Sequence, residues 1–142
     1  MQSLSLDQAA TMVDAALQKA HELELKPMTI AVLDAGGHLV AFKREDGSSI
    51  LRPQIAQAKA WGALGMGMGG RALAERAATQ PSFVAALSDI SGGRIVPVPG
   101  GVLVLSPEGV ILGALGVTGD LSDQDEACAV AAIESSGFKA QV

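Results

Sequence analysis

The fold is decided by the C-terminal third of the chain, Gly92–Ala132, which reads GGRIVPVPGGVLVLSPEGVILGALGVTGDLSDQDEACAVAA. A turn broken by Pro and Gly leads into two apolar runs, Val102–Leu105 and Val110–Thr118. The four-residue linker Ser106–Gly109 separates them. Two short apolar runs joined by so short a linker predict a β-hairpin.

A Gly-rich turn, Gly116–Asp120, follows this hairpin and leads into the acidic helix start Ser122–Asp125. Ser122 is a typical cap, and the carboxylates after it suit the positive end of a helix, so we expect a helix to about Ser135. The turn and the pair Gly100–Gly101 are the two places where we expect bare backbone to approach a ligand.

The N-terminal part predicts a helix followed by a second hairpin. Ser5–Gln8 has the form of a capping box, and apolar residues then recur at helical spacing to about Leu25. Lys26-Pro27 ends this helix. The runs Met28–Leu33 and Leu39–Phe42 flank turn residues and predict two antiparallel strands.

Helices are predicted between the two hairpins. Pro53 suits a first helical turn, and the apolar pattern continues to Leu64. GMGMGG at Gly65–Gly70 breaks this helix, and two short helices follow at Arg71–Ala78 and Pro81–Leu87. The order is α-β-β-α-α-α-β-β-α, which predicts an α+β fold with an antiparallel sheet.

Composition predicts one domain, residues 1–142, that associates with copies of itself. Hydrophobic residues make up 49% and charged residues 18% of the 142 residues, so apolar surface remains to be covered by a homo-oligomer. The net charge of −5 and the absence of a basic stripe exclude nucleic acid as an expected partner.

The sequence also predicts a cytoplasmic protein without a membrane partner. The longest apolar runs are too short to cross a bilayer, and the N-terminus MQSLSLDQAA lacks the basic region of a secretory signal. The single cysteine, Cys128, allows no disulfide within the chain, and its alanine neighbours predict a packed side chain.

Neither the glycine-rich stretch GMGMGG nor the spacing of the two histidines indicates a phosphate or zinc site. GMGMGG follows a predicted helix rather than a strand and lacks the Lys-Ser/Thr of a phosphate loop, so we interpret it as a hinge. His38 lies at a predicted loop tip, and neither histidine has a second metal-binding residue at zinc spacing. His21, at the edge of the apolar helix face, is either an iron ligand or base, or a half-exposed boundary residue.

A set of charged residues is a stronger candidate for chemistry. It comprises Asp34, Arg44, Glu45, Asp46 and Lys59. Asp34 and Arg44 flank one hairpin, so we expect them to form an ion pair near its ends. Lys59 is the only charge between Pro53 and Gly70, so its ammonium either reaches the surface or is buried against a carboxylate or a ligand anion.

Five segments together resemble the GlcG/HbpS-like family, small haem-binding or haem-degrading domains related to the C-terminal domain of PduO-type proteins. They are IAVLDAGGHLVAFKREDG, QIAQAKAWGAL, PVPGGVLVL, GVILGALGVTGD and DQDEACA, within Leu6–Ile133. The resemblance implies a profilin-like or PAS-like antiparallel sheet of about five strands flanked by helices, in a homo-oligomer of four or more copies. Arg94–Val98 is our candidate for the fifth strand.

The resemblance also implies binding of haem or another tetrapyrrole such as a corrinoid, accessory to a metabolic or redox system. His21 is the candidate axial ligand, although it matches no family motif. Residues that match the motifs are Asp34, Arg44, Asp46, Lys59, Gly100, Gly101, Gly116 and Asp120. The alternative function is a cofactor-free isomerase, lyase or hydrolase for a hydroxy- or oxo-acid, in which Lys59 and Arg44 hold the carboxylate and Asp34 or Asp46 moves the proton.

Overall fold

The computed structural model describes residues 2–142 and confirms the predicted order of elements, with one strand added at the C-terminus. The elements are α1 (Leu6–Glu22), β1 (Thr29–Asp34), β2 (Leu39–Arg44), α2 (Arg52–Met66), α3 (Gly70–Thr79), α4 (Pro81–Ile90), β3 (Gly101–Leu105), β4 (Ile111–Thr118), α5 (Ser122–Ser135) and β5 (Lys139–Gln141). The fold is therefore α+β, as predicted.

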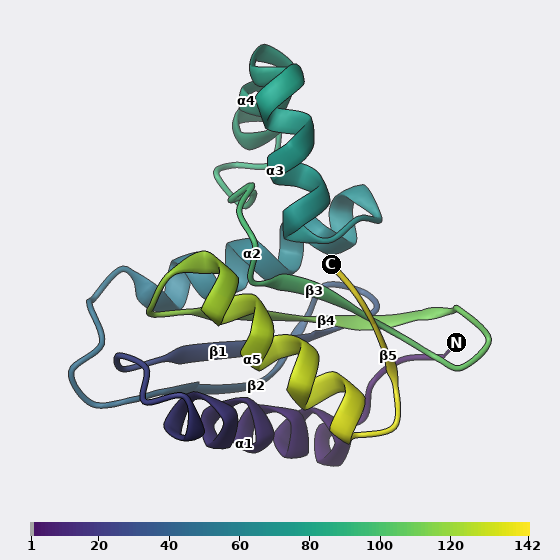
Figure 1. Ribbon diagram of the computed structural model, residues 1–142. Coiled ribbons are helices and arrows are strands. Elements are labelled where there is room, and N and C mark those ends of the chain that lie inside the picture. The colour runs from purple at the N-terminus through teal and green to yellow at the C-terminus, as the bar shows by residue number, and fades with distance from the viewer. Residues whose placement is uncertain (1) are drawn as a thin grey trace.

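The five strands form one antiparallel sheet in the order β2-β1-β4-β3-β5. Helices α1 and α5 lie side by side on one face of the sheet, and α2 crosses the other face, whereas α3 and α4 project away from the sheet (Figure 1). The sheet is thus covered on both faces.

Helix α1 begins as its sequence predicts. The Ser5 hydroxyl accepts a hydrogen bond from the Gln8 amide at 3.2 Å, and the Gln8 side chain accepts one from the Ser5 amide at 2.9 Å. These two bonds satisfy amides that a helix start leaves free. The helix ends at Glu22, three residues before the predicted Leu25, and Glu24 adopts a left-handed φ of 55°.

The two faces of the sheet pack differently. Large side chains fill the face under α1 and α5, among them Met12, Ile30 and Leu115. The opposite face packs on α2 through small residues, including Ala60 and Ala114. Small side chains let the helix backbone approach the sheet closely.

The fifth strand is not the predicted Arg94–Val98. It is β5, which pairs with β3 at the edge of the sheet. Arg94–Val98 forms no strand, because Pro97 has no amide hydrogen to give to a ladder and the Val98 amide instead donates to the Val96 carbonyl.

The cap predicted for α5 is also wrong. Leu121 occupies the cap position, and Ser122, the first helical residue, makes no side-chain cap bond. The Asp125 carboxylate instead fixes the turn before the helix, because its Oδ1 accepts a hydrogen bond from the Asp120 amide at 3.0 Å. Among residues 2–142, no helix combines the length and the apolar character that crossing a membrane requires.

Candidate functional site

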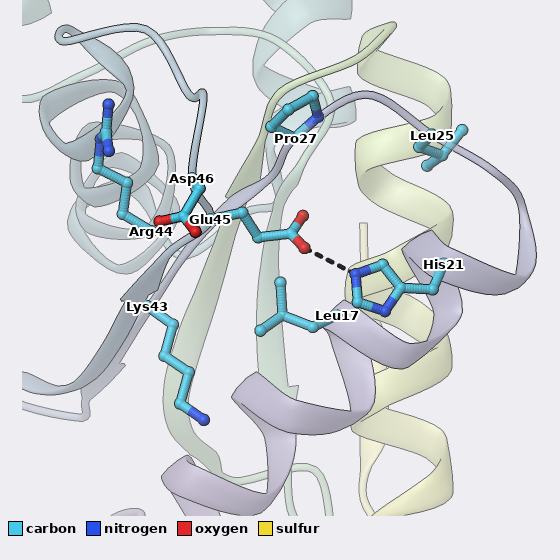
Figure 2. Close-up of a pocket in the computed structure, with 8 residues that line it drawn as sticks. All are labelled: Leu17, His21, Leu25, Pro27, Lys43, Arg44, Glu45 and Asp46. Atoms are coloured by element: carbon cyan, nitrogen blue, oxygen red, sulfur yellow. Dashed lines mark hydrogen bonds and ion pairs between the residues drawn. The ribbon is translucent and has the colours of Figure 1, made fainter.

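A hollow of about 560 Å³ lies where the C-terminal end of α1 meets the end of β2 (Figure 2). Its lining residues are Leu17, His21, Leu25, Pro27, Lys43, Arg44, Glu45 and Asp46. The turn after α1 brings Leu25 and Pro27 to its wall, so two elements distant in sequence enclose it. We call it the His21 hollow.

His21 is held by a carboxylate in this hollow. Its Nε2 lies 2.7 Å from Glu45 Oε2, and the side chain is 67% exposed. The other Glu45 oxygen accepts a hydrogen bond from the Met28 amide at 2.8 Å. Glu45 therefore ties the end of α1 to the start of β1 and fixes the imidazole at the mouth of the hollow.

The two cations that line the hollow point in different directions. Lys43 extends along α1, where its Nζ lies 2.7 Å from Asp14 Oδ1. Figure 2 shows Arg44 turned away from His21, and its guanidinium donates to the Ser48 carbonyl. Asp46 follows β2 and is exposed. Three of the predicted site residues thus line the hollow, namely His21, Arg44 and Asp46. The direct contact that His21 makes in the hollow is with Glu45.

A second hollow, of about 360 Å³, lies beside the first residues of α2, and we call it the Arg52 hollow. It is lined by Lys26, Pro27, Gly47, Ser48, Ser49, Arg52, Gly119, Asp120 and Leu121. Hydrogen bonds from the amides of Lys26 (3.0 Å) and Leu121 (2.7 Å) lower the pKa of Asp120, because they favour its charged form. Arg52 was not among the predicted site residues, and only its place before Pro53 at a helix start marks it in the sequence.

Lys59 is buried against a carboxylate, as one of the two sequence interpretations expected. Its Nζ lies 3.2 Å from Asp125 Oδ2 and 3.0 Å from the Val117 carbonyl oxygen. Burial lowers the pKa of Lys59 and raises that of Asp125, because both charged forms lose water, while each charge partly restores the other. Helix capping had accounted for Asp125 in the sequence, so this partner was missed.

The predicted ion pair between Asp34 and Arg44 does not form. Asp34 lies at the turn end of the β1–β2 hairpin, whereas Arg44 pairs with Thr29 at the opposite end. Asp34 Oδ1 instead accepts hydrogen bonds from the Gly36 and His38 amides, both at 3.0 Å. Burial acts to raise the pKa of Asp34, but these bonds and the His38 ring outweigh it and lower the pKa.

The charged groups that the hydroxy-acid enzyme would need are consequently separate. Lys59 is buried with Asp125, Arg44 turns to the Ser48 carbonyl, and Asp34 lies at the far end of the hairpin. Asp46, the other candidate for the proton transfer, lines the same hollow as Arg44, but the buried Lys59 does not, so the geometry does not favour this alternative.

The predicted ligand-binding glycines lie under helix α2. A Cβ on Gly116 would overlap the Ala56 carbonyl, and one on Gly101 would overlap the Lys59 carbonyl. Gly100 lies against the Lys59 side chain, and all three glycines are buried. The sequence predicted that a ligand would approach the backbone at these glycines. Helix α2 makes that close approach instead.

The structure gives the remaining candidates, GMGMGG and Cys128, structural roles rather than a place in a site. GMGMGG ends α2 through Gly67, which has the left-handed φ of 65° that is typical of a glycine helix cap. Cys128 is fully buried, and burial raises its pKa to about 11, so the thiolate is disfavoured. Within residues 2–142, no three His, Cys, Asp or Glu side chains form a group that could hold a metal ion.

A search against protein families matches residues 4–134 to a family described as haem-degrading protein HbpS-like. Among curated proteins, the corrinoid adenosyltransferase PduO of Citrobacter freundii is 33% identical over 132 residues, which are 92% of this chain. The chain spans only 38% of the length of that relative.

Solved structures share the fold over nearly the whole chain. A PduOC–haem complex superposes with a TM-score of 0.87 at 25% identity, covering 99% of both chains. Klebsiella pneumoniae ORFY gives 0.85 at 29% identity over 96% of this chain and 92% of its own. A double mutant of Streptomyces reticuli HbpS gives a TM-score of 0.82 at 28% identity, over 95% of this chain and 88% of its own.

Proposed function

The chain belongs to the HbpS-like family, and from this premise we propose that it binds haem, with His21 as the axial ligand. The observation that carries the proposal is the exposed imidazole at the mouth of a hollow, in a chain whose fold matches that of a protein solved with haem. Bound haem would supply a redox-active iron.

The residues of the His21 hollow fit a haem group. A histidine-ligated haem uses a neutral imidazole nitrogen for its iron, apolar contacts for its ring and cations for its propionates. His21 offers the nitrogen, and Leu17, Leu25 and Pro27 offer apolar surface. Lys43 lies at the rim with its side chain 58% exposed, so its ammonium is free to turn from Asp14 to a propionate.

Glu45 holds the imidazole of the haem-free protein in this proposal, and so it competes with iron for His21 Nε2. It contacts His21 Nε2, so this nitrogen must leave the carboxylate before it binds iron, or the ring must turn and present Nδ1 to Glu45. A carboxylate that accepts a hydrogen bond from a ligating histidine fixes the ring and raises its basicity.

We also propose that the chain forms a homo-oligomer. Large apolar side chains stay exposed on this protomer, with Ile50 at 90%, Ile90 at 82% and Leu121 at 74%. A homo-oligomer would cover such side chains between its copies. Sedimentation of the purified protein tests this, because a monomer at micromolar concentration would contradict it.

Haemin titration of the purified protein tests the ligand assignment. We expect a saturable Soret shift, its loss in His21→Ala, and an unchanged titration in the control His38→Ala, which removes the other, 80% exposed histidine. No saturable shift would overturn haem binding. A shift that His21→Ala leaves unchanged would overturn the ligand assignment alone.

A further inference from the structure

The Arg52 hollow is built from four separate segments. Its charged and hydroxyl-bearing residues have no part in the haem binding proposed for the His21 hollow. The loop after β2 contributes Gly47–Ser49, the first residue of α2 contributes Arg52, the turn after β4 contributes Gly119–Leu121, and Lys26-Pro27 closes it. Only Pro27 lines both hollows.

One residue that lines this hollow, Ser48, carries a buried hydroxyl without a hydrogen-bond partner. Within residues 2–142, the buried side-chain polar atoms that lack a hydrogen bond are Ser48 Oγ and Thr29 Oγ1. Ser48 is a lining residue and is 7% exposed. A buried hydroxyl normally has a partner, because removing it from water without one is unfavourable. The Ser48 hydroxyl is therefore a donor that lacks its acceptor.

The second unpaired hydroxyl, Thr29 Oγ1, belongs to the residue opposite Thr118 in the sheet. Thr29 pairs with Thr118 across the β1–β4 ladder, so their side chains share one face of the sheet. Thr118 Oγ1 accepts a hydrogen bond from Arg52 Nη1 at 2.6 Å. Arg52 thus connects the hollow to Thr118, the residue opposite the unpaired Thr29 hydroxyl.

Cations outnumber carboxylates around the hollow. Arg52 and Lys26 form no ion pair within the described residues, and the buried Lys59 lies close enough to Arg52 for the two charges to interact. Asp125 pairs with Lys59 and also lies close enough to Arg52 for their charges to interact. Asp120 lines the hollow, both its oxygens accept backbone amides, and its charge interacts with that of Lys26. The guanidinium carries five donors, of which one is used, so it can receive an anion in a bidentate pair.

We propose that the Arg52 hollow binds a small oxyanion, a carboxylate or a phosphate group. Arg52 pairs with two of its oxygens, and the Ser48 hydroxyl donates to one of them. Lys26, at the rim, contributes charge. This site is independent of haem, because its cation and its orphaned hydroxyl lie outside the lining of the His21 hollow.

Amide chemical shifts of the haem-free, full-length protein test the proposal. The protein is titrated with sodium phosphate and, separately, with sodium acetate, and sodium chloride at equal ionic strength is the reference. We expect saturable shifts at Ser48, Ser49 and Gly119 with at least one of the two oxyanions. Saturation with phosphate alone assigns a phosphate group, and saturation with acetate alone assigns a carboxylate.

Variants separate a site from general charge attraction. Arg52→Gln is expected to weaken binding about tenfold, because a charge-assisted bond is lost. It also removes the bond to Thr118, so Ser48→Ala provides a second test with a hydroxyl that has no other partner, and is expected to weaken binding about threefold. The control Lys139→Gln removes one exposed charge on β5 and should leave the affinity unchanged.

Three results would overturn the proposal. Shifts that grow linearly with salt, or equally with chloride, would show no site. Equal affinity in wild type, Arg52→Gln and Ser48→Ala would place the anion elsewhere. Haem binding is measured by a different signal with a different variant, so its failure would not affect this result.

Discussion

Lys59 Nζ and Asp125 Oδ2 lie 3.2 Å apart, with the two side chains only 3% and 1% exposed. The pair joins α2 and α5, which cover opposite faces of the sheet, and Lys59 also donates to the Val117 carbonyl on β4. Asp125 in turn accepts the Asp120 amide. Every charge in this pair thus has further hydrogen-bond partners, which a buried ion pair needs in order to be tolerated.

Removing one member of this pair should strongly destabilise the protein. Asp125→Asn leaves the Lys59 ammonium buried without its counter-charge, so we expect a loss of about 3–5 kcal/mol in the free energy of unfolding. Urea unfolding at pH 7 measures it. The control Asp123→Asn, whose carboxylate is 77% exposed beside Arg71, should cost less than about 1 kcal/mol. Equal losses in the two variants would contradict the prediction.

Replacing both members by apolar residues should recover much of that loss. In Lys59→Met with Asp125→Leu, no charge stays buried, and measured cases show that such replacements are often neutral or stabilising. We expect the double variant to be more stable than Asp125→Asn by at least about 2 kcal/mol. A double variant as unstable as the sum of its single variants would show that the hydrogen bonds to Val117 and Asp120, rather than the charges, hold this corner.

Gly116 should not accept a side chain. A Cβ there overlaps the Ala56 carbonyl, so Gly116→Ala must push α2 away from β4, at a cost of about 3 kcal/mol. The matched control is Gly109→Ala. Gly109 has a φ of +88° and open space around its Cβ, so its variant bears only backbone strain of about 1 kcal/mol. Thermal unfolding compares the two, and equal losses would exclude close packing as the cause.

The sequence predicts the fold well because its signals are local. The capping box at Ser5–Gln8, the turn residues of both hairpins and the helix-breaking glycines act on their neighbours in the chain, and the elements follow them. The edge strand β5 was missed because it has only three residues and depends on pairing with β3.

The candidate site was predicted less completely, because its contacts join distant positions. His21 and Glu45 are 24 residues apart, and Lys59 and Asp125 are 66 apart. Sequence spacing carries no sign of such pairs. The Asp125 carboxylate also satisfies a helix-start pattern, so local chemistry explained it before its buried partner was known. Gly116 was expected to leave room for a ligand, but only packing shows that α2 fills that room.

Asp120 should make stability depend on pH in the acid range. Its pKa in the folded protein lies below the ordinary aspartate value of 3.8, because the Lys26 and Leu121 amides bond to its charged form. The unfolded chain therefore takes up this proton first as the pH falls, so the contribution is full above pH 3.8 and is lost below it as the folded group is protonated. The stability of Asp120→Asn should lie furthest below that of the wild type above pH 5, and the two stabilities should approach each other near pH 2. Urea midpoints across this range measure the difference, and a constant difference would contradict the assignment.

Glu45 should tune haem binding through His21, because its Oε2 contacts the nitrogen proposed to bind iron, at 2.7 Å. In Glu45→Gln the charged partner of Nε2 is gone, so we expect haemin to bind several-fold more tightly, by roughly the 1 kcal/mol of one hydrogen bond. The control Glu22→Gln, on the same helix and paired with Lys19, should titrate as wild type. Soret titrations at pH 7 give the three affinities. Weaker binding in Glu45→Gln would show instead that Glu45 supports the imidazole from its other nitrogen when iron is bound, and would reverse its role from competitor to orienting group.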